Sequence, residues 1–266
     1  MSRLYFVCHG QGDPIIILHG LLGSSSNWSA TSAMLGKRLQ VFTLDLRNHG
    51  NSPHSSEFDY PSMAEDVKSF MDTQGLRHAT ILGHSLGGKV AMVFADLYPE
   101  MVDKMIIVDI APKTYPVVHK ALIETMLAVD LNIYNKVNDV VTALATSIPS
   151  IQVRNFLAKN LCKQDSSFWW KVNLQAIRDN IDRLSERISF RNSFEKPVLF
   201  IRGHLSDYIL EEDKASLYKI YPRAEIVTIE GAGHWVHIDA KNSFVNKVWN
   251  FMFCGSCRPW CNDCGR

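Results

Sequence analysis

The sequence has 266 residues with 28 basic and 27 acidic side chains, which gives a formal net charge of +1. Hydrophobic residues make up 46% of the chain and charged residues 21%, which is typical of a folded globular protein and excludes an intrinsically disordered one. The balanced charge provides no basic field for binding nucleic acid. No stretch approaches the roughly 18 consecutive apolar residues of a membrane span. We therefore expect one large domain, or one domain with an insertion.

The first residues of the chain predict a β-strand. Residues 1–8 carry one basic side chain and a short apolar run, and a turn-forming stretch follows at residues 10–14. No small-residue cleavage site follows, so the segment does not have the pattern of an export signal. The expected location is therefore cytoplasmic.

Further along the chain, short apolar runs rich in β-branched residues alternate with stretches of helical periodicity. Such runs, when bounded by Gly, Pro or Asp, are typical of parallel strands covered by helices on both faces. The predicted strands lie at residues 14–18, 40–44, 79–82, 104–108, 197–201 and 224–229, and the predicted helices at residues 61–74, 87–98 and 242–252. This alternation predicts an α/β fold with a mostly parallel central sheet flanked by helices.

The alternation is interrupted between residues 111 and 195, where we predict no strand. A structureless loop of this length is implausible inside a compact domain, so we expect a helical cap over one end of the sheet. Its helix-like pieces lie at residues 119–129, 133–146, 151–161 and 168–180. The predicted organisation is a core of residues 1–110 and 196–253, a cap of residues 111–195 and a tail of residues 254–266.

The cap contains the aromatic run of Phe168, Trp169 and Trp170. Aromatic residues at helical spacing usually pack in a core, which is our first interpretation. An apolar acyl pocket beneath the cap is the alternative.

The strongest local signal is a G-x-S-x-G run at residues 83–87, centred on Ser85. It follows a predicted strand and opens a predicted helix, which is the context of a nucleophile elbow. The glycines are needed because the serine sits on a very sharp turn, and the helix that follows directs its positive end at the serine. Ser85 is therefore the candidate nucleophile, and a chance match in a tight turn is the alternative.

A serine hydroxyl needs a base to take its proton. His234 is the candidate base, because it follows the last predicted strand and small residues precede it, whereas His237 falls where the final helix should begin. The expected order of serine, acid and histidine favours Asp207 as the acid, on the loop after the predicted strand at residues 197–201. Asp109, which directly follows the predicted strand at residues 104–108, remains the alternative acid.

Backbone amides should form the oxyanion hole. The first expected donor is the amide of Leu86, the residue after the nucleophile, and the second is that of Leu21, directly after His19 and Gly20. A plain glycine turn is the alternative for the second loop. The polar run at residues 45–52 follows another strand, and we interpret it as structural turn chemistry at the same edge of the sheet.

Four cysteines crowd the end of the chain at Cys254, Cys257, Cys261 and Cys264. Paired cysteines can hold a metal ion, but the two pairs lie far closer together than the roughly 12–20 residues of common zinc modules. We therefore interpret the segment as a tail, with a compact thiolate metal site as the alternative.

Five runs, at residues 19–24, 45–54, 60–66, 83–89 and 108–112, resemble the YbfF-type esterases of the α/β-hydrolase superfamily. The similarity covers about residues 2–253, and the Asp-Leu-Arg-Asn-His-Gly and Asp-Ile-Ala-Pro runs are specific to this branch. The resemblance implies an α/β-hydrolase fold and a carboxylesterase without a cofactor, with acyl-CoA thioesters as a further substrate class. Ser85 and His234 match the family pattern, whereas the acid stays open because Asp109 lies in a family run.

We therefore expect a serine carboxylesterase that hydrolyses short- to medium-chain esters through an acyl-enzyme on Ser85, with His234 as base and Asp207 as acid. The expected partner is a small-molecule acyl ester or thioester, and neither a cofactor nor a metal is expected. The alternatives are a C–C bond hydrolase or a perhydrolase on the same scaffold, or a ligand sensor without turnover. A complete set of serine, histidine and acid argues against the sensor.

Overall fold

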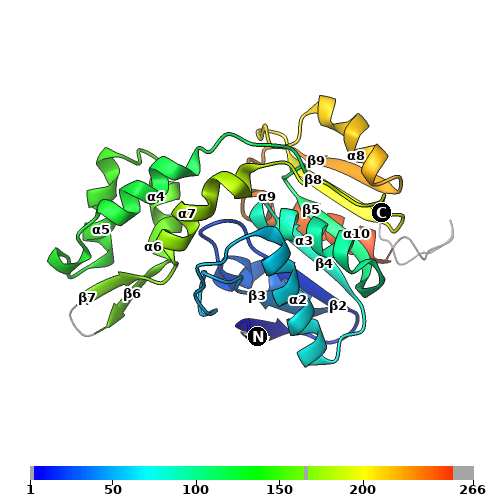
Figure 1. Cartoon of the computed structure of the whole chain (residues 1–266), viewed down its shortest axis with the longest axis horizontal. Helices are drawn as coiled ribbons and strands as arrows, with labels where there is room; N and C mark the ends of the chain where they lie inside the picture. Colours follow the sequence, from blue (N-terminus) through cyan, green and yellow to red (C-terminus); the bar gives the residue numbers. More distant parts are fainter. Residues whose placement is uncertain (1–2, 165–166, 254–266) are drawn as a thin grey trace.

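The computed structural model describes residues 3–164 and 167–253, which form a sheet-containing core and a smaller lobe beside it (Figure 1). Within the described residues the core sheet has seven strands in the order β1-β3-β2-β4-β5-β8-β9. The strands are β1 (Phe6–His9), β2 (Pro14–Leu18), β3 (Gln40–Leu44), β4 (Ala79–His84), β5 (Val102–Val108), β8 (Val198–Gly203) and β9 (Ala224–Ile229). All neighbouring pairs are parallel except β1 with β3, which confirms the predicted mostly parallel sheet.

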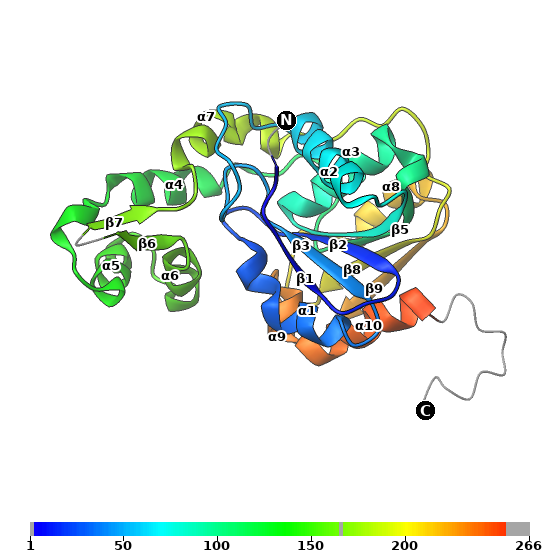
Figure 2. The same cartoon turned by 90° about the horizontal axis from the view of Figure 1, so that it is seen from below.

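Helices cover both faces of this sheet (Figure 2). One face carries α2 (Tyr60–Gln74), α3 (Leu86–Leu97) and α8 (Lys214–Ile220), and the other carries α1 (Ser29–Leu35), α9 (Val236–Asp239) and α10 (Lys241–Phe253). The three helices predicted for the core are present, and the short helices α1 and α8, of seven residues each, and α9, of four, are additions.

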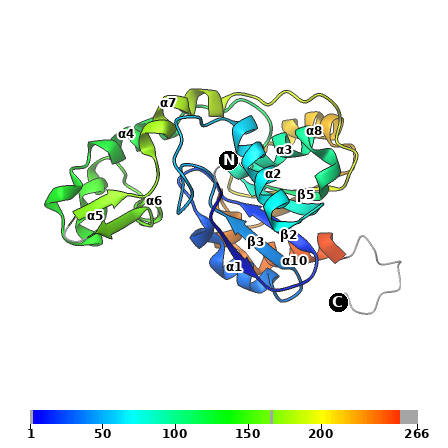
Figure 3. The ribbon, with the colours of Figure 1, turned by 60° about the horizontal axis from the view of Figure 1, so that its bottom comes forward.

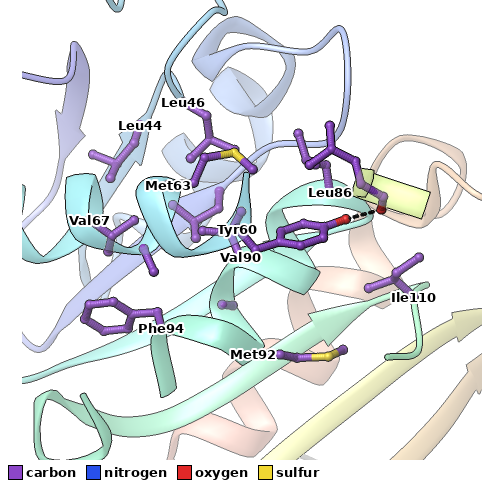
Figure 4. Packing of buried hydrophobic residues seen from close by; sticks show 14 of the residues in the cluster. Leu44, Leu46, Tyr60, Met63, Val67, Leu86, Val90, Met92, Phe94 and Ile110 are labelled. Carbon is purple, nitrogen blue, oxygen red and sulfur yellow. Dashed lines mark hydrogen bonds between the residues drawn. The ribbon is translucent and has the colours of Figure 1, made fainter. Parts of the chain in front are cut away.

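The alternation of side chains along the strands divides the apolar residues between two cores. In β2, Ile16 and Leu18 pack on the side of α2 and α3, whereas Ile15 and Ile17 pack on the side of α1 and α10. This is the two-residue period of a strand that is buried on both faces. Figure 4 shows the first of these cores, in which residues such as Met63 and Phe94 fill the space between α2, α3 and the sheet. Each such buried side chain contributes about 1.5–3 kcal/mol to stability.

The segment between β5 and β8 forms the smaller lobe. It contains α4 (His119–Ala128), α5 (Val137–Ala143), α6 (Ile151–Ala158), β6 (Leu161–Gln164), β7 (Ser167–Trp170) and α7 (Leu174–Ser185). Of these elements α7 lies nearest to the core and α5 farthest from it (Figure 3). We refer to this lobe as the cap.

The expectation that the cap contains no strand is wrong. The strands β6 and β7 form an antiparallel hairpin in place of parts of two predicted helices. The aromatic run explains the difference: Phe168 is buried while Trp169 is exposed, which is the alternation of a strand and not of a helix. Trp170 donates from Nε1 to the carbonyl of Met126 at 3.0 Å and ties the hairpin to α4.

A helix cap stabilises the start of α7, and a hydrogen bond near its other end connects it to the core. The side chain of Asn173 accepts from the amide of Ala176 and caps the start of α7. At its other end, the hydroxyl of Tyr60 donates to the carbonyl of Leu184 at 2.5 Å, as drawn in Figure 4. The cap is therefore connected to α2 through a buried polar contact.

Within the described residues no helix combines the length and the apolar character needed to cross a membrane. In the same part of the chain no three His, Cys, Asp or Glu side chains are arranged to hold a metal ion. The predictions for the four C-terminal cysteines lie outside the described residues.

Candidate active site

Ser85 occupies the junction between β4, which ends at His84, and α3, which begins at Leu86. Its φ of 52° lies in the left-handed region, which a residue with a side chain adopts at a cost of about 1–2 kcal/mol. Its amide donates to the carbonyl of Val108 at 3.1 Å, so β5 supports the turn. The sharp strand-to-helix turn predicted from the sequence is therefore present around this serine.

Two glycines make this turn possible. A Cβ atom on Gly83 would lie 2.1 Å from the carbonyl oxygen of Gly87, and one on Gly87 would lie 2.3 Å from the carbonyl oxygen of Leu18. Both distances are shorter than any real contact of a Cβ atom, so the backbone would have to move. Glycine is therefore required at both positions, because neighbouring backbone comes too close for a side chain.

Asp109 follows the neighbouring strand β5 and is completely buried. Its carboxylate accepts from Nδ1 of His234 at 2.8 Å, from the amide of Gly203 at 3.1 Å and from the hydroxyl of Ser206. The carboxylate therefore reaches past the end of β8 to the loop that follows β9. The contact holds the imidazole of His234 in one orientation and assigns the Nδ1 proton to the Asp109 side.

The preference for Asp207 over Asp109 as the partner of the histidine needs correction. Asp207 is exposed at the surface, whereas its neighbour Ser206 faces inward and donates to Asp109. The loop after β8 thus reaches Asp109 through the hydroxyl of Ser206 and not through Asp207. In the sequence both aspartates follow predicted parallel strands, so their positions along the chain do not distinguish them. The directions of their side chains in the structure do.

His234 has surroundings that differ from those of the other histidines around Ser85. The ring of Tyr208 stacks on its imidazole with 3.9 Å between the ring centroids. His84 lies on the other side and donates from Nε2 to the carbonyl of His234 at 2.9 Å. Burial, reinforced by the neighbouring His234 and His237, lowers the pKa of His84 well below its usual value.

His237, the weaker candidate for the base, is buried against aromatic residues of the core. It lies in α9 and stacks on the ring of Trp28 with 3.9 Å between centroids and nearly parallel planes. Burial and the nearby His234 lower the pKa of His237 to about 3, so it is neutral at pH 7. Among the cavity-lining histidines of the described chain, His234 is the one within hydrogen-bonding distance of a carboxylate.

The two amides proposed for the oxyanion hole lie next to amides that are already occupied. The amide of Leu22 donates to Nε2 of His49 at 3.1 Å, and that of Gly87 donates to the carbonyl of His19 at 3.1 Å. For Leu21 and Leu86, by contrast, we find no acceptor among residues 3–164 and 167–253. Both residues line a cavity whose wall also includes Ser85, which is where an oxyanion hole would be needed.

The polar run at residues 45–52 stabilises the neighbouring loops. The carboxylate of Asp45 accepts from the amide of Ser25 at 2.6 Å and from that of Asn51 at 2.7 Å. These bonds agree with our interpretation of the run as structural turn chemistry. The role of His49 in holding Leu22 was not anticipated, since a histidine in a polar turn carries no sequence signal for such a contact.

Two cavities meet at Ser85. The larger, of about 290 Å³, lies between the core and the cap and is mainly apolar; we call it the large cavity. The cap side of its wall consists of Val118, His119, Leu122, Val153 and Phe156, and the core side includes Trp28, His234 and Trp235. Ser85 also lines a second, small cavity of about 60 Å³. The aromatic run of β7 lines neither cavity; Phe168 and Trp170 pack in the cap, as we preferred, whereas Trp169 is exposed.

The comparisons with known proteins agree with this architecture. The model of the alpha/beta hydrolase fold family matches residues 13–147. The sn-1-specific diacylglycerol lipase ABHD11 of Xenopus laevis is 34% identical over 253 residues, which cover 91% of this chain and 80% of that protein. Esterase YbfF of Escherichia coli is 30% identical over 245 residues, which cover 91% of this chain and 94% of that protein. A solved structure of a marine microorganism esterase is 39% identical and superposes with a TM-score of 0.92, covering 94% of this chain and all of the other.

The fold and these relatives define an enzyme, a serine hydrolase of the esterase class. More particularly, the chain belongs to the α/β-hydrolase family. The resemblance to YbfF-type esterases seen in the sequence is thereby confirmed.

Proposed function

We propose that the protein hydrolyses short- to medium-chain carboxylic esters through an acyl-enzyme on Ser85, with His234 as the base and Asp109 as the acid. The observation that carries the proposal is the hydrogen bond between His234 and the buried Asp109, beside a cavity that both His234 and Ser85 line. The names of the relatives, which include an esterase and a diacylglycerol lipase, support ester substrates.

The proposed reaction has two halves. Oγ of Ser85 attacks the ester carbonyl carbon while Nε2 of His234 takes the serine proton, and the tetrahedral oxyanion accepts from the amides of Leu21 and Leu86. The carbon–oxygen bond to the alcohol then breaks, and His234 returns the proton to the leaving alkoxide. In the second half a water molecule gives a proton to His234 and attacks the acyl-enzyme, which releases the acid and restores Ser85.

The buried carboxylate of Asp109 stabilises the imidazolium that forms in both halves. Acyl-CoA thioesters fall within the same proposal, because a thiolate can leave from the same tetrahedral intermediate.

Hydrolysis of p-nitrophenyl esters from acetate to laurate tests the proposal. We expect turnover by the parent protein, loss of turnover by about 10⁶-fold in Ser85→Ala, and no comparable loss in Ser56→Ala, whose serine is exposed on a loop. Mass spectrometry should find a fluorophosphonate probe attached to Ser85. Turnover that persists in Ser85→Ala, or a folded parent protein inactive on every ester, would contradict the proposal.

A further inference from the structure

The small cavity beside Ser85 contains a buried charge that the proposed reaction does not use. Its walls include Tyr60, Leu86 and Ile110, all labelled in Figure 4, together with Lys89 of α3. Lys89 is only 2% exposed. A buried ammonium is unusual, because removing it from water is costly unless it is paired.

The position of Lys89 is set by the nucleophile turn. The residue lies one helical turn after Ser85, and its amide donates to the carbonyl of Ser85 at 3.1 Å. Both residues contribute to the wall of the small cavity. The lysine therefore lies in the same cavity wall as the nucleophile, one helical turn further along the chain.

The ammonium of Lys89 has a single hydrogen-bond partner within the described chain, the carbonyl of Glu186, at 2.6 Å. The rings of Tyr60 and Tyr115 face it at 5.6 and 5.2 Å from Nζ to the ring centroid. No carboxylate of the described residues lies within ion-pair distance of it. Burial lowers the pKa of Lys89 to about 8, so most of the side chain is still charged at pH 7.

A second lysine shows what a purely structural contact of this kind looks like. Lys104, at the opposite end of the sheet, donates to the carbonyls of Phe251 and Met252 and faces the ring of Phe251. It contacts the end of α10 and lines neither cavity at Ser85. Lys89, by contrast, donates to one carbonyl where Lys104 donates to two. It also lines a cavity whose wall includes Ser85.

We propose that Lys89 binds a carboxylate that the substrate carries a short distance from its scissile ester, within the small cavity. This inference rests on the proposed esterase function. The volume of about 60 Å³ suits a short acidic arm and not a long chain. The apolar remainder of the substrate then occupies the large cavity, and Ser85 lies at the junction of the two.

The test compares monobutyl glutarate with its neutral isostere, the butyl ester in which an isopropyl group replaces the carboxylate. A second pair places the same two groups on the alcohol side of a butyrate ester, and so identifies which side of the ester enters the small cavity. We measure kcat/KM for both pairs with the parent protein, Lys89→Met, Lys89→Arg and the matched control Lys104→Met. Unfolding in urea reports on the integrity of each variant.

We expect the parent protein to prefer the acidic member of one pair by at least about tenfold, which is the size of one charge-assisted contact. Lys89→Met should abolish that preference, Lys89→Arg should keep part of it, and Lys104→Met should keep all of it. Equal rates of the parent protein on both members of both pairs would overturn the inference. So would an equal loss on acidic and neutral esters in Lys89→Met, which is the result expected if Lys89 only ties α3 to the end of α7.

A binding measurement separates this inference from the proposed function. Calorimetry with monobutyl glutarate and its alcohol-side counterpart is carried out on Ser85→Ala and on the double variant Ser85→Ala/Lys89→Met. At least tenfold weaker binding of the preferred acid to the double variant would support the contact even if turnover were not found. Equal affinities would refute the contact while leaving ester hydrolysis intact.

Discussion

At the scale of single residues, the site depends on which histidine has a charged partner. His84 and His237 are buried beside Ser85, and burial lowers the pKa of each, so both remain neutral near pH 7. His234 differs because a buried carboxylate holds its Nδ1 and leaves Nε2 free to face the cavity. An imidazole that is held in this way can take and return a proton without losing its orientation.

The two candidate acids are distinguished by a pair of amide substitutions. We expect Asp109→Asn to lower kcat on p-nitrophenyl butyrate by about 10⁴-fold, because the amide cannot stabilise the imidazolium and favours the wrong tautomer. The matched Asp207→Asn, at an exposed position, should change kcat by no more than about twofold. Circular dichroism checks that both variants are folded. The reverse ranking of the two variants would return the acid to Asp207.

At the scale of elements, two loops hold each other through a pair of histidines. His19, in the loop after β2, accepts at Nε2 from the amide of Leu46, and His49, in the loop after β3, accepts at Nε2 from the amide of Leu22. Burial and the neighbouring His19 lower the pKa of His49 to about 3, which keeps its Nε2 available as an acceptor. Leu22 has a φ of 59°, so this bond helps to stabilise a backbone conformation that is otherwise unfavourable.

Substitution of His49 tests whether the hydrogen bond between Leu22 and His49 positions the neighbouring amide of Leu21. His49→Phe fills the same space but leaves the buried amide of Leu22 without a partner, at a cost of about 1–3 kcal/mol. We expect kcat to fall at least about tenfold with little change in KM, because an oxyanion donor acts mainly in the transition state. The control His54→Phe changes an exposed side chain of the same segment and should leave kcat near the parent value. A change in KM alone would argue against the positioning role.

At the scale of the whole molecule, the large cavity exists because the cap lies over the carboxyl ends of the strands (Figure 1). Helices α4 and α6 of the cap supply apolar side chains to its wall, and the core supplies Ser85 and His234. Under the proposed function, we expect side chains of the cap that do no chemistry to limit the size of the acyl group that reaches Ser85.

A bulky residue on the inner face of α6 should shorten the preferred acyl chain. Val153→Trp places a large ring in the large cavity, whereas Ile151→Trp places the same ring on the exposed face of the same helix, where Ile151 is 45% exposed. We expect the optimum of the p-nitrophenyl ester series to move to shorter chains in Val153→Trp only. Activity on acetate should remain, because the smallest substrate does not need the filled space. Identical chain-length profiles in both variants would show that the acyl group lies elsewhere.

Local sequence patterns were sufficient to predict the strands of the core, its three longest helices and the turn at Ser85. Strands such as residues 224–229 and the helix after Ser85 follow from local periodicity, and the nucleophile turn follows from glycines at fixed spacing. His234 was found from its position after the last strand. The cap hairpin was missed because the aromatic run around Phe168 was assigned a helical period, although its burial alternates as in a strand.

The contact between His234 and Asp109 and the surroundings of Ser85 depend on tertiary packing. Asp109 and Asp207 both follow parallel strands, and the choice depends on the direction of each side chain at the carboxyl ends of neighbouring strands. The hydrogen bonds that His19 and His49 accept from each other's loops likewise connect residues that are far apart in the chain. The wall of the small cavity at Lys89 is also built from distant segments. Such contacts are set by strand register and by the packing of the cap on the core, which no local pattern of residues contains.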